Sequence, residues 1–399
     1  MKLAVLPSLQ GVAADAWDAL TGPDHPFVEH AFLLALEQTG SVGPGTSWMP
    51  AYLVVVEDAV DVAAALDEGT PLRPLAAAPC YLKGDSWGEF VFDWQWAEVF
   101  ALQGKAYYPK LVCAVPFTPA TGRRLLVDDA RPAADALRAQ LVAGLAGLAR
   151  QTNASSAHAL FLEPSDLQVF LDGGFAERWT LQHQFHNRDA EGRPYPSFDA
   201  FLASMRAPAR KAVRRERRIA ASHGLTLELR WGHELSADDW ARIAELYRLG
   251  CARYGSPPYL DSAMFAWMRD AFAERVRCSL ARDPDGRIVA MTLNFEKQGV
   301  LYGRYWGAED EWPMLHFELA YYRLIEDAIT RGLGRLEAGS GGGHKLRRGL
   351  QPTLCRSAHL VFDPELGPAI RAWLERERRA IGQQRAALRA AGTERRDGT

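Results

Sequence analysis

The sequence predicts an α/β protein made of two successive units. Strand-like and helix-like patterns alternate along nearly the whole chain, and its 399 residues are enough for two hydrophobic cores at roughly 100–200 residues per domain. A polar stretch with glycine and proline, residues 188–197, interrupts this alternation near the middle. We therefore expect an N-terminal domain over 1–187, a linker over 188–197, a second domain over 198–365, and a charged helix with a frayed tail over 366–399.

The amino-acid composition indicates a cytoplasmic protein without a metal site or a membrane span. Of its residues 48% are hydrophobic and 24% are charged, and the formal net charge of -3 provides no overall positive field for nucleic acids. None of the five cysteines forms a C-x-x-C pair, which argues against a disulfide scaffold or a zinc cluster. The N-terminus lacks the features of a signal peptide, and no apolar run approaches the ~20 residues that cross a bilayer.

The first half of the chain alternates strands and helices. Runs of β-branched and aromatic residues indicate strands, apolar residues at helical spacing indicate helices, and glycine or proline separates them. After a short strand and helix in 1–20, we predict strands at 52–57, 75–82, 157–162 and 175–187, and helices at 30–39, 131–150 and 164–172. In the last strand His183 and His186 are three residues apart and point to opposite faces, which argues against a shared metal ion.

The aromatic segment from Trp87 to Trp96 does not resemble a regular core element. Interpreted as a strand, it places Glu89 and Asp93 on one face. Two carboxylates beside tryptophans suit either a cationic or sugar substrate or a solvated edge, and the aromatic and proline residues in the following loops favour a pocket. We predict an acceptor pocket formed by Glu89, Asp93, Trp94, Tyr108 and Lys110.

The second half repeats the alternation after the linker. Asp285 and Gly286 suit a hairpin turn between two strands. By the same patterns we predict helices at 198–205, 206–218, 237–251, 261–273 and 368–389, and strands at 226–230, 277–281, 287–296 and 355–362.

The helix over Arg206 to Arg218 is strongly basic and contains a single acid, Glu216. Arg210 and Arg214 lie four residues apart and share one helical face with Arg218. Like charges at this spacing repel one another. The run therefore indicates an anionic partner, such as a cofactor phosphate, a tRNA acceptor end or a lipid pyrophosphate, or else a solvated face paired with acids elsewhere in the fold.

The stretch over residues 300–349 is where we expect the chemistry. Residues 300–305 indicate a strand, Pro313 suits the first turn of a helix, and residues 333–338 indicate a second strand. A glycine loop over 339–343 follows. Glycines let backbone N–H groups approach an anion and cations balance its charge, so the loop predicts a cradle for a phosphate-bearing ligand. The basic residues that end it are His344, Lys345, Arg347 and Arg348.

Glu318 lies on the apolar face of the helix in this stretch, together with Leu315 and Tyr322. A carboxylate there is either paired or raised in pKa, and either state suits a general base that takes a proton from an amine. The alternative is a buried glutamate bonded to a tyrosine or arginine for structural reasons. His316 is a second candidate base, or else a histidine of the core or of the helix cap.

Several segments taken together carry a family resemblance. They are HPFVEHAFLLALEQTGSVG, WGEFVFDWQWA, YYPKLVCAVPFTPATGRRLL, RKAVRRERR, LYGRYWG, LHFELAYY, EAGSGGGHKLRRGLQP and the closing ERERRA helix. With these segments the chain, from about Pro26 to Arg379, resembles the FemAB-like proteins of peptidoglycan biosynthesis or recognition, within the GNAT acyltransferase superfamily.

This resemblance implies two tandem GNAT-like domains, each a mixed sheet flanked by helices, in an enzyme that moves an acyl or aminoacyl group onto an amine. Donor phosphates of such domains lie at the strand–helix splay, which corresponds to residues 304–315 and includes Arg304 and Gly307. The loop from Lys345 to Gly349 is similar to the basic K-x-x-x-G element of Fem-type transferases. Only Gly307 remains of the superfamily's pyrophosphate loop, so the co-substrate is either acyl-CoA or, as in Fem-type relatives, aminoacyl-tRNA.

Our hypothesis is therefore an N-acyltransferase without a tightly bound cofactor, acting on a small-molecule amine. Glu318 or His316 would accept the amine proton, and Lys345 or a backbone N–H near 305–307 would stabilise the oxyanion. Donor phosphates would bind Arg210, Arg214, Arg304, Gly307, Arg347 and Arg348. Two alternatives stay open: a non-catalytic module that recognises a cell-wall precursor, and a nucleic-acid-contacting protein that uses the basic helix, against which the net charge weighs.

Overall fold

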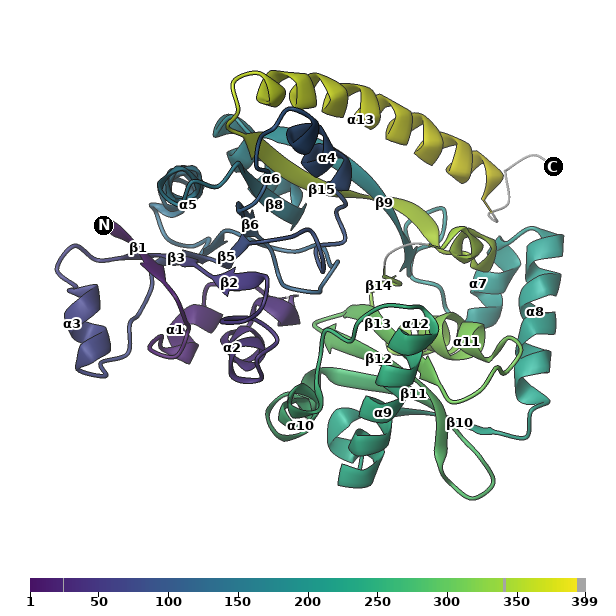
Figure 1. Ribbon diagram of the computed structural model, residues 1–399. Coiled ribbons are helices and arrows are strands. Elements are labelled where there is room, and N and C mark those ends of the chain that lie inside the picture. The colour runs from purple at the N-terminus through teal and green to yellow at the C-terminus, as the bar shows by residue number, and fades with distance from the viewer. Residues whose placement is uncertain (24, 340–341, 393–399) are drawn as a thin grey trace. The chain divides into compact units, whose positions relative to one another are not determined.

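The computed structural model describes residues 1–23, 25–339 and 342–392 (Figure 1). It consists of helices and of strands that pair in parallel and antiparallel orientation. The chain divides into two units. Unit 1 contains residues 1–180 and 354–382, and unit 2 contains residues 181–353 and the chain from 383 onward. Parallel and antiparallel pairs occur in both, so the predicted mixed α/β class is confirmed.

Unit 1 alternates short strands and helices. Its helices are α1 (Ala14–Asp18), η1 (Pro26–Val28), α2 (His30–Gln38), α3 (Val62–Asp67), α4 (Trp94–Leu102), α5 (Ala134–Gln151) and α6 (Pro164–Asp172). Its strands are β1 (Lys2–Leu6), β2 (Trp48–Pro50), β3 (Tyr52–Val56), β4 (Ala76–Ala78), β5 (Cys80–Lys83), β6 (Lys110–Cys113), β7 (Leu126–Val127) and β8 (Ser156–Leu162). The strands β9 (Ala176–His186) and β15 (Gln351–Val361) and the helix α13 (Leu366–Ala391) have residues in both units.

Residues 354–361 return to unit 1 as part of β15, whereas the predicted ranges assign them to the second domain. There β15 pairs antiparallel with β8, about two hundred residues earlier in the chain: Val361 lies opposite Ser156 and His359 opposite His158. Such a pairing depends on contacts between distant segments, and no local sequence pattern reveals it. The predicted charged helix at the C-terminus is present as α13. Of the frayed tail predicted over 390–399, residues 390–391 still belong to α13, and 393–399 lie outside the described residues.

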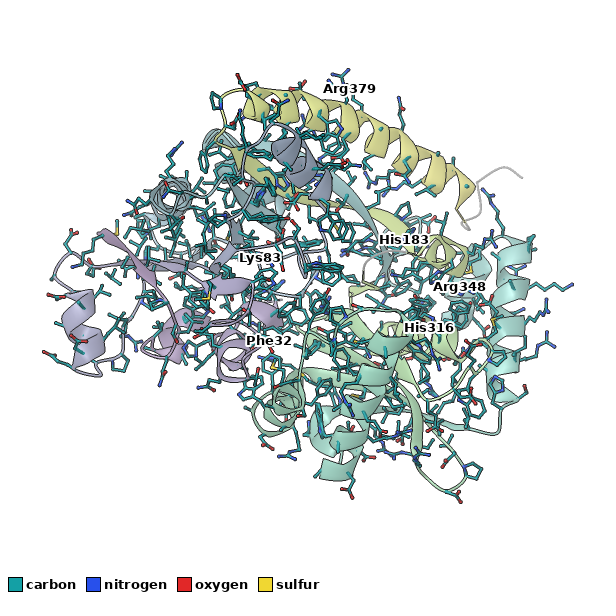
Figure 2. All side chains as sticks on the ribbon, in the orientation of Figure 1. Phe32, Lys83, His183, His316, Arg348 and Arg379 are labelled. Carbon is teal, nitrogen blue, oxygen red and sulfur yellow. The ribbon has the colours of Figure 1, made fainter. Side chains whose placement is uncertain are left out.

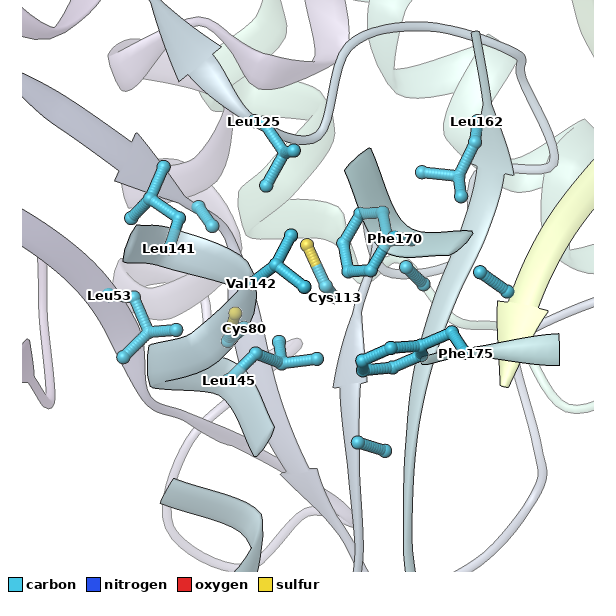
Figure 3. Packing of buried hydrophobic residues seen from close by; sticks show 14 of the residues in the cluster. Leu53, Cys80, Cys113, Leu125, Leu141, Val142, Leu145, Leu162, Phe170 and Phe175 are labelled. Atoms are coloured by element: carbon cyan, nitrogen blue, oxygen red, sulfur yellow. The ribbon is translucent and has the colours of Figure 1, made fainter. Parts of the chain in front are cut away.

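The core of unit 1 lies beneath α5. In one sheet β1, β3, β4 and β7 are antiparallel, and in the other β6 runs parallel to β8. Apolar residues of α5 recur at helical spacing, and Leu141 and Leu145 pack against Leu53 and Phe170 (Figure 3). These four side chains are at most 1% exposed. Burial of each contributes about 1.5–3 kcal/mol, which makes this cluster the main apolar support of unit 1.

Unit 2 is built around a longer sheet. Its helices are α7 (Phe198–Ser204), α8 (Ala207–Ala221), η2 (Gly232–Glu234), α9 (Ala237–Arg253), α10 (Ser262–Ala271), η3 (Ala273–Arg275), α11 (Leu315–Phe317), η4 (Glu318–Tyr322), α12 (Arg323–Thr330) and η5 (Gly343–Arg348). Its strands are β10 (Thr226–Trp231), β11 (Val276–Arg282), β12 (Ile288–Lys297), β13 (Val300–Ala308) and β14 (Arg335–Glu337). The predicted strand at 300–305, the helix after Pro313 and the basic helix are therefore confirmed as β13, α11 to α12, and α8.

The sheet of unit 2 has the order β10–β11–β12–β13–β14–β9. Only its β13–β14 pair is parallel, with Tyr302 opposite Glu337, and the crossover between these strands is the helical segment α11–η4–α12. The carboxyl ends of parallel strands lie at the same edge of a sheet. Because β14 stops at Glu337 while β13 continues to Ala308, the chain after β14 lies beside the exposed end of β13.

Two glycines let α9 lie directly against β13. A Cβ atom on Gly307 would come within 2.1 Å of the Leu246 carbonyl oxygen, and one on Gly250 within 2.3 Å of the Trp306 carbonyl oxygen. Backbone atoms cannot move aside as a flexible side chain can. Gly307, which the sequence assigned to donor binding, therefore has a packing role here.

Replacing Gly307 with alanine should destabilise the protein by about 1–3 kcal/mol, the usual cost of overpacking. Thermal unfolding followed by circular dichroism measures this loss. Gly286, in the exposed hairpin turn, has no atom within 4 Å of a built Cβ but a φ of +84°, so alanine there tests backbone strain alone. An alanine at position 307 that unfolded at the wild-type temperature would contradict the close contact between α9 and β13.

The segment from Trp87 to Trp96 is not the strand that the sequence predicted. Gly88 and Phe90 have φ values of +80° and +59°, so the chain turns, and α4 begins at Trp94. The alternating pattern misled the prediction because the buried lysine Lys110, which lies outside the segment, holds its acidic side chains Glu89 and Asp93 inward.

In the part of the chain that the structure describes, no helix combines the length and the apolar character that crossing a membrane requires.

Candidate functional site

The residues predicted to form the site fall into two groups, one in each unit. Unit 2 contains Glu318, His316, Lys345, Arg210, Arg214, Arg304, Gly307, Arg347 and Arg348, and unit 1 contains Glu89, Asp93, Trp94, Tyr108 and Lys110.

Lys345 occupies the turn that follows β14. Its ammonium nitrogen Nζ donates hydrogen bonds to the carbonyl oxygens of Ala338 (2.6 Å) and Gly339 (2.9 Å), and the residue is 4% exposed. Burial lowers the pKa of Lys345 to about 8. This turn is the predicted glycine loop, of which residues 340–341 lie outside the described residues. The arrangement fixes a single cation next to the carboxyl ends of β13 and β14.

Histidines and aromatic rings surround this cation. The ring of His344 contacts those of Phe317 and Tyr321, and its Nε2 lies 3.2 Å from the Tyr321 hydroxyl oxygen. Burial, followed by the positive charges of Arg348 and Lys345, lowers the pKa of His344 below its ordinary value. His344 is exposed and therefore accessible, and its lowered pKa leaves it neutral at neutral pH. The Tyr321 hydroxyl orients the ring, so His344 is suited to act as a base.

His316, the second base that the sequence suggested, is packed into the same cluster. Its ring centroid lies 4.9 Å from that of Trp306 and 5.5 Å from that of Tyr321. Burial, followed by the positive charges of His344 and Lys345, lowers its pKa to about 4. This environment fits the alternative that the sequence left open, a neutral histidine of the core.

His183 is a site residue that the sequence analysis did not identify. It is 7% exposed, and neither ring nitrogen has a hydrogen-bond partner among the described residues. Its carbonyl oxygen accepts from the Ala338 N–H (3.3 Å), and Lys345 and His344 add to burial in lowering its pKa. Figure 2 marks His183 and His316 within unit 2. A histidine in a strand gives no sequence signal of this kind, because only the pairing of β9 with β14 brings it here.

Glu318 is engaged in an ion pair. Its two oxygens accept from Nε and Nη2 of Arg217, both at 3.0 Å, and Arg217 also binds Glu326 (2.7 Å). Both oxygens of this carboxylate are therefore occupied by the guanidinium in a two-point geometry. The structure therefore agrees with the alternative that Glu318 is a buried glutamate bonded to an arginine for structural reasons. His344 is the better candidate for the base.

The helical segment that provides these groups contains a π-turn, η4. Such turns are rare and often accompany functional sites. Here the turn buries both Tyr321 and Tyr322, and the Tyr322 hydroxyl donates to Glu216 of α8. Arg348, predicted to bind a phosphate, donates to both oxygens of Glu216 at 3.0 Å. Arg348 thus ties the basic loop to α8.

The remaining predicted cations lie on the surface or near it. Arg214 and Arg347 are exposed, and Arg210 is half-buried, with Nη1 3.5 Å from the Met205 carbonyl oxygen. Arg214, Arg217 and Arg218 line a cavity of about 700 Å³ between α7, α8 and α12, which we call the basic groove. Two acids, Asp199 and Glu326, also line it and pair with Arg214 and Arg217.

Arg304 extends from β13 with its guanidinium 5.2 Å from the Tyr305 ring centroid. After β13 the chain continues with three acids, Glu309, Asp310 and Glu311, at the position where the resemblance implies donor phosphates. Glu309 is paired with Arg242 and Arg287, whereas Asp310 and Glu311 are exposed carboxylates that would repel a pyrophosphate.

In unit 1, the residues of the predicted acceptor pocket also come together, but most are buried. Lys110 Nζ donates to Asp93 (2.5 Å) and Glu89 (2.9 Å), and the Tyr107 hydroxyl donates to Asp93 (2.6 Å). Burial raises the pKa of Glu89 to about 7, although Lys110 opposes the rise. Burial alone would raise the pKa of Asp93 as well, but the charge of Lys110 outweighs it and holds that pKa at about 2. Three predicted pocket residues thus form a closed ion cluster.

The other two predicted pocket residues lie at the surface beside this cluster. Tyr108 is half-buried, with its hydroxyl 2.8 Å from that of Ser86, and Trp94 is 44% exposed. Across the described residues, no group of three or more histidine, cysteine, aspartate and glutamate side chains is placed to hold a metal ion.

Comparison with known proteins places the chain in a family. The sequence model of the FemAB-like family, described as peptidoglycan biosynthesis/recognition, matches residues 8–396, and the chain belongs to this family. The resemblance noted in the sequence is thereby confirmed. A search of curated proteins found no match.

Solved structures share the fold. FemX is 12% identical, with a TM-score of 0.51 over 93% of this chain and 100% of its own. A structure from Agrobacterium fabrum, described as the C-terminal domain of a lysylphosphatidylglycerol synthetase, is 11% identical. It has a TM-score of 0.51 over 87% of this chain and 91% of its own.

Proposed function

We propose that this member of the FemAB-like family is an N-acyltransferase that moves an aminoacyl group from aminoacyl-tRNA to an amine acceptor. Its family and its fold support a transferase. The observation that carries the proposal is the cluster in unit 2, where the exposed neutral base His344 lies next to the buried cation Lys345 at the carboxyl ends of β13 and β14.

Each group of this cluster has a step to perform. The acceptor amine attacks the ester carbonyl, and the carbonyl oxygen becomes an oxyanion, which the Lys345 ammonium stabilises. With Nε2 donating to the Tyr321 oxygen, Nδ1 of His344 keeps a lone pair and takes the proton from the attacking nitrogen. The same proton then goes to the ribose oxygen as the ester bond breaks. Near neutral pH the lowered pKa of His344 leaves its imidazole neutral, and Lys345, with a pKa of about 8, keeps its charge. Both protonation states are the ones that these steps require.

The choice of donor follows from the charges around the site. The exposed acids Asp310 and Glu311, which follow β13, disfavour the pyrophosphate of coenzyme A. The exposed cations of α8 and the basic groove instead provide a surface for the phosphates of a nucleic acid, which are spread over a greater length. These exposed cations therefore favour a charged tRNA over a thioester as the donor.

Binding of a 3′-aminoacyl RNA minihelix should be saturable and weaken steeply with salt, whereas acetyl-CoA should not bind. We expect the paired variant Arg214→Gln, Arg218→Gln to lower the salt slope by about two units, roughly one per phosphate contact. Calorimetry at several salt concentrations measures it. Arg193→Gln, an exposed arginine of the same unit that pairs with Asp189, serves as the control.

Three outcomes of this test differ in meaning. Saturable binding of acetyl-CoA in place of the minihelix would contradict the donor assignment. An unchanged slope in the paired variant would remove α8 from the donor surface. Tight binding of the minihelix without transfer to any amine would replace the enzyme with a non-catalytic recognition module.

Transfer should decline as the pH rises above about 8. Burial lowers the pKa of Lys345 to about 8 from an ordinary value well above it, so the ammonium that stabilises the oxyanion loses its proton in that range. Arginine keeps its charge, so Lys345→Arg should move the decline to higher pH. A pH profile of kcat/KM measures this, and an alkaline limb identical in both proteins would contradict the role of Lys345.

A further inference from the structure

His183 is a buried imidazole that the fold leaves without a hydrogen-bond partner. The residue is 7% exposed, and within the part of the chain that the structure describes neither Nδ1 nor Nε2 is bonded. Buried polar groups are nearly always paired, because an unpaired one destabilises the fold. The buried histidines of unit 1 follow this rule, since His158 and His359 each bond to a serine hydroxyl at 2.8 Å. An open imidazole in unit 2 is therefore a group that a bound ligand can satisfy.

Strand pairing places this imidazole on the side of the sheet where the proposed transfer groups lie. Alternate residues of a strand share a face, so His183 lies on the face of Phe185. Phe185 belongs to the same buried cluster as Tyr321, the residue that orients the proposed base. The Ala338 N–H donates to the His183 carbonyl oxygen (3.3 Å), and the Ala338 carbonyl oxygen accepts from Lys345 Nζ (2.6 Å). A single residue thus connects the open histidine to the buried cation.

The charges around His183 keep its ring neutral. Burial, followed by the positive charges of Lys345 and His344, lowers the pKa of His183 below its ordinary value. A neutral imidazole has one N–H donor and one lone pair. Its N–H can donate to a substrate oxygen on which negative charge develops, without placing a second full positive charge beside the ammonium. A neutral histidine next to a catalytic group can polarise a carbonyl in this way.

We propose that His183 is a second oxyanion donor, which acts together with Lys345 on the carbonyl oxygen of the aminoacyl ester. This role rests on the proposed function. As the amine attacks, the C–N bond forms and the carbonyl electron pair moves onto oxygen, which accepts the His183 N–H and the Lys345 ammonium. The carbonyl then forms again as the bond to the ribose oxygen breaks. His183 keeps its proton throughout, and the proton of the amine travels through His344 as described above.

Replacing His183 with alanine should lower kcat of aminoacyl transfer by about 10²–10³-fold, the range expected for loss of one oxyanion donor. The affinity for the charged minihelix and KM should stay near the wild-type values, because the contact strengthens only in the transition state. His183→Gln retains an N–H donor and should recover part of the rate. His186→Ala removes a histidine from the opposite face of the same strand and should react like the wild type. Single-turnover kinetics measure these rates.

A stability measurement separates this role from a structural one. His183→Leu replaces an unpaired buried ring with an apolar side chain, so it should unfold at or above the wild-type temperature while it loses as much rate as His183→Ala. Circular dichroism during heating measures the unfolding temperature. A histidine needed for folding would give the reverse, a lower unfolding temperature and a nearly full rate in the folded protein.

The outcomes distinguish this role from the proposed function. Transfer that depends on His344 and Lys345 but proceeds at the wild-type rate in His183→Ala and His183→Leu would overturn the second donor alone. A loss confined to KM, or a clear fall in the unfolding temperature of His183→Leu, would also remove it. No transfer by the wild-type protein would overturn the proposed function and the role of His183 with it.

Discussion

Replacing His344 with alanine should lower kcat of aminoacyl transfer by about 10²–10⁴-fold, the range expected for loss of a general base. His344 is an exposed residue whose ring is partly buried, and this burial, followed by the charges of Arg348 and Lys345, lowers its pKa; the Tyr321 hydroxyl lies 3.2 Å from Nε2 and orients the ring. Without it the attacking amine has no fixed acceptor for its proton. Single-turnover kinetics with a charged minihelix measure the chemical step, and the affinity for the minihelix should change little.

Two further variants separate catalysis from folding. His233→Ala removes a partly exposed histidine of the same unit and should leave the rate unchanged. Tyr321→Phe removes only the orienting hydroxyl, so it should lower kcat by less than His344→Ala does and leave KM near the wild-type value. A rate in His344→Ala within about threefold of wild type, in a folded protein, would reject this residue as the base.

Replacing Lys110 with methionine should destabilise the protein by roughly 3–5 kcal/mol, the cost of leaving buried carboxylates without their cation. Lys110 is 0% exposed and binds Asp93 at 2.5 Å and Glu89 at 2.9 Å. Methionine is of similar length, so little packing is lost and the effect is electrostatic. Urea unfolding, monitored by circular dichroism, measures the change in free energy of unfolding.

A matched surface pair and a compensating change test this explanation. Arg214→Met breaks the exposed contact between Arg214 and Asp199, 3.5 Å apart, and should cost less than about 1 kcal/mol. Adding Asp93→Leu to Lys110→Met removes one of the stranded carboxylates and should restore part of the stability. A Lys110→Met protein as stable as the wild type would mean that the two carboxylates take up protons at little cost.

The sequence alone predicted the elements around the proposed transfer site well. The strand from Val300, the helix after Pro313 and the basic loop at Lys345 all have strong local signals, namely β-branched runs, helical spacing and glycines. The family resemblance was also available from sequence, because several short segments matched together. Roles for individual residues were harder to predict: Gly307 packs against α9, and Glu318 is bound by Arg217.

What the sequence determined by itself is the α/β class, the position of the basic helix and loop, and the family. Only the tertiary structure decided which side chains act together. Pairing of β9 with β14 brings His183 to Lys345, and Lys110 of β6 binds both acids of an apparent strand that is instead a loop. The physical reason is the range of the forces. Backbone propensity and apolar periodicity act between neighbours in sequence, whereas ion pairs, burial and pKa values depend on groups that only folding brings together.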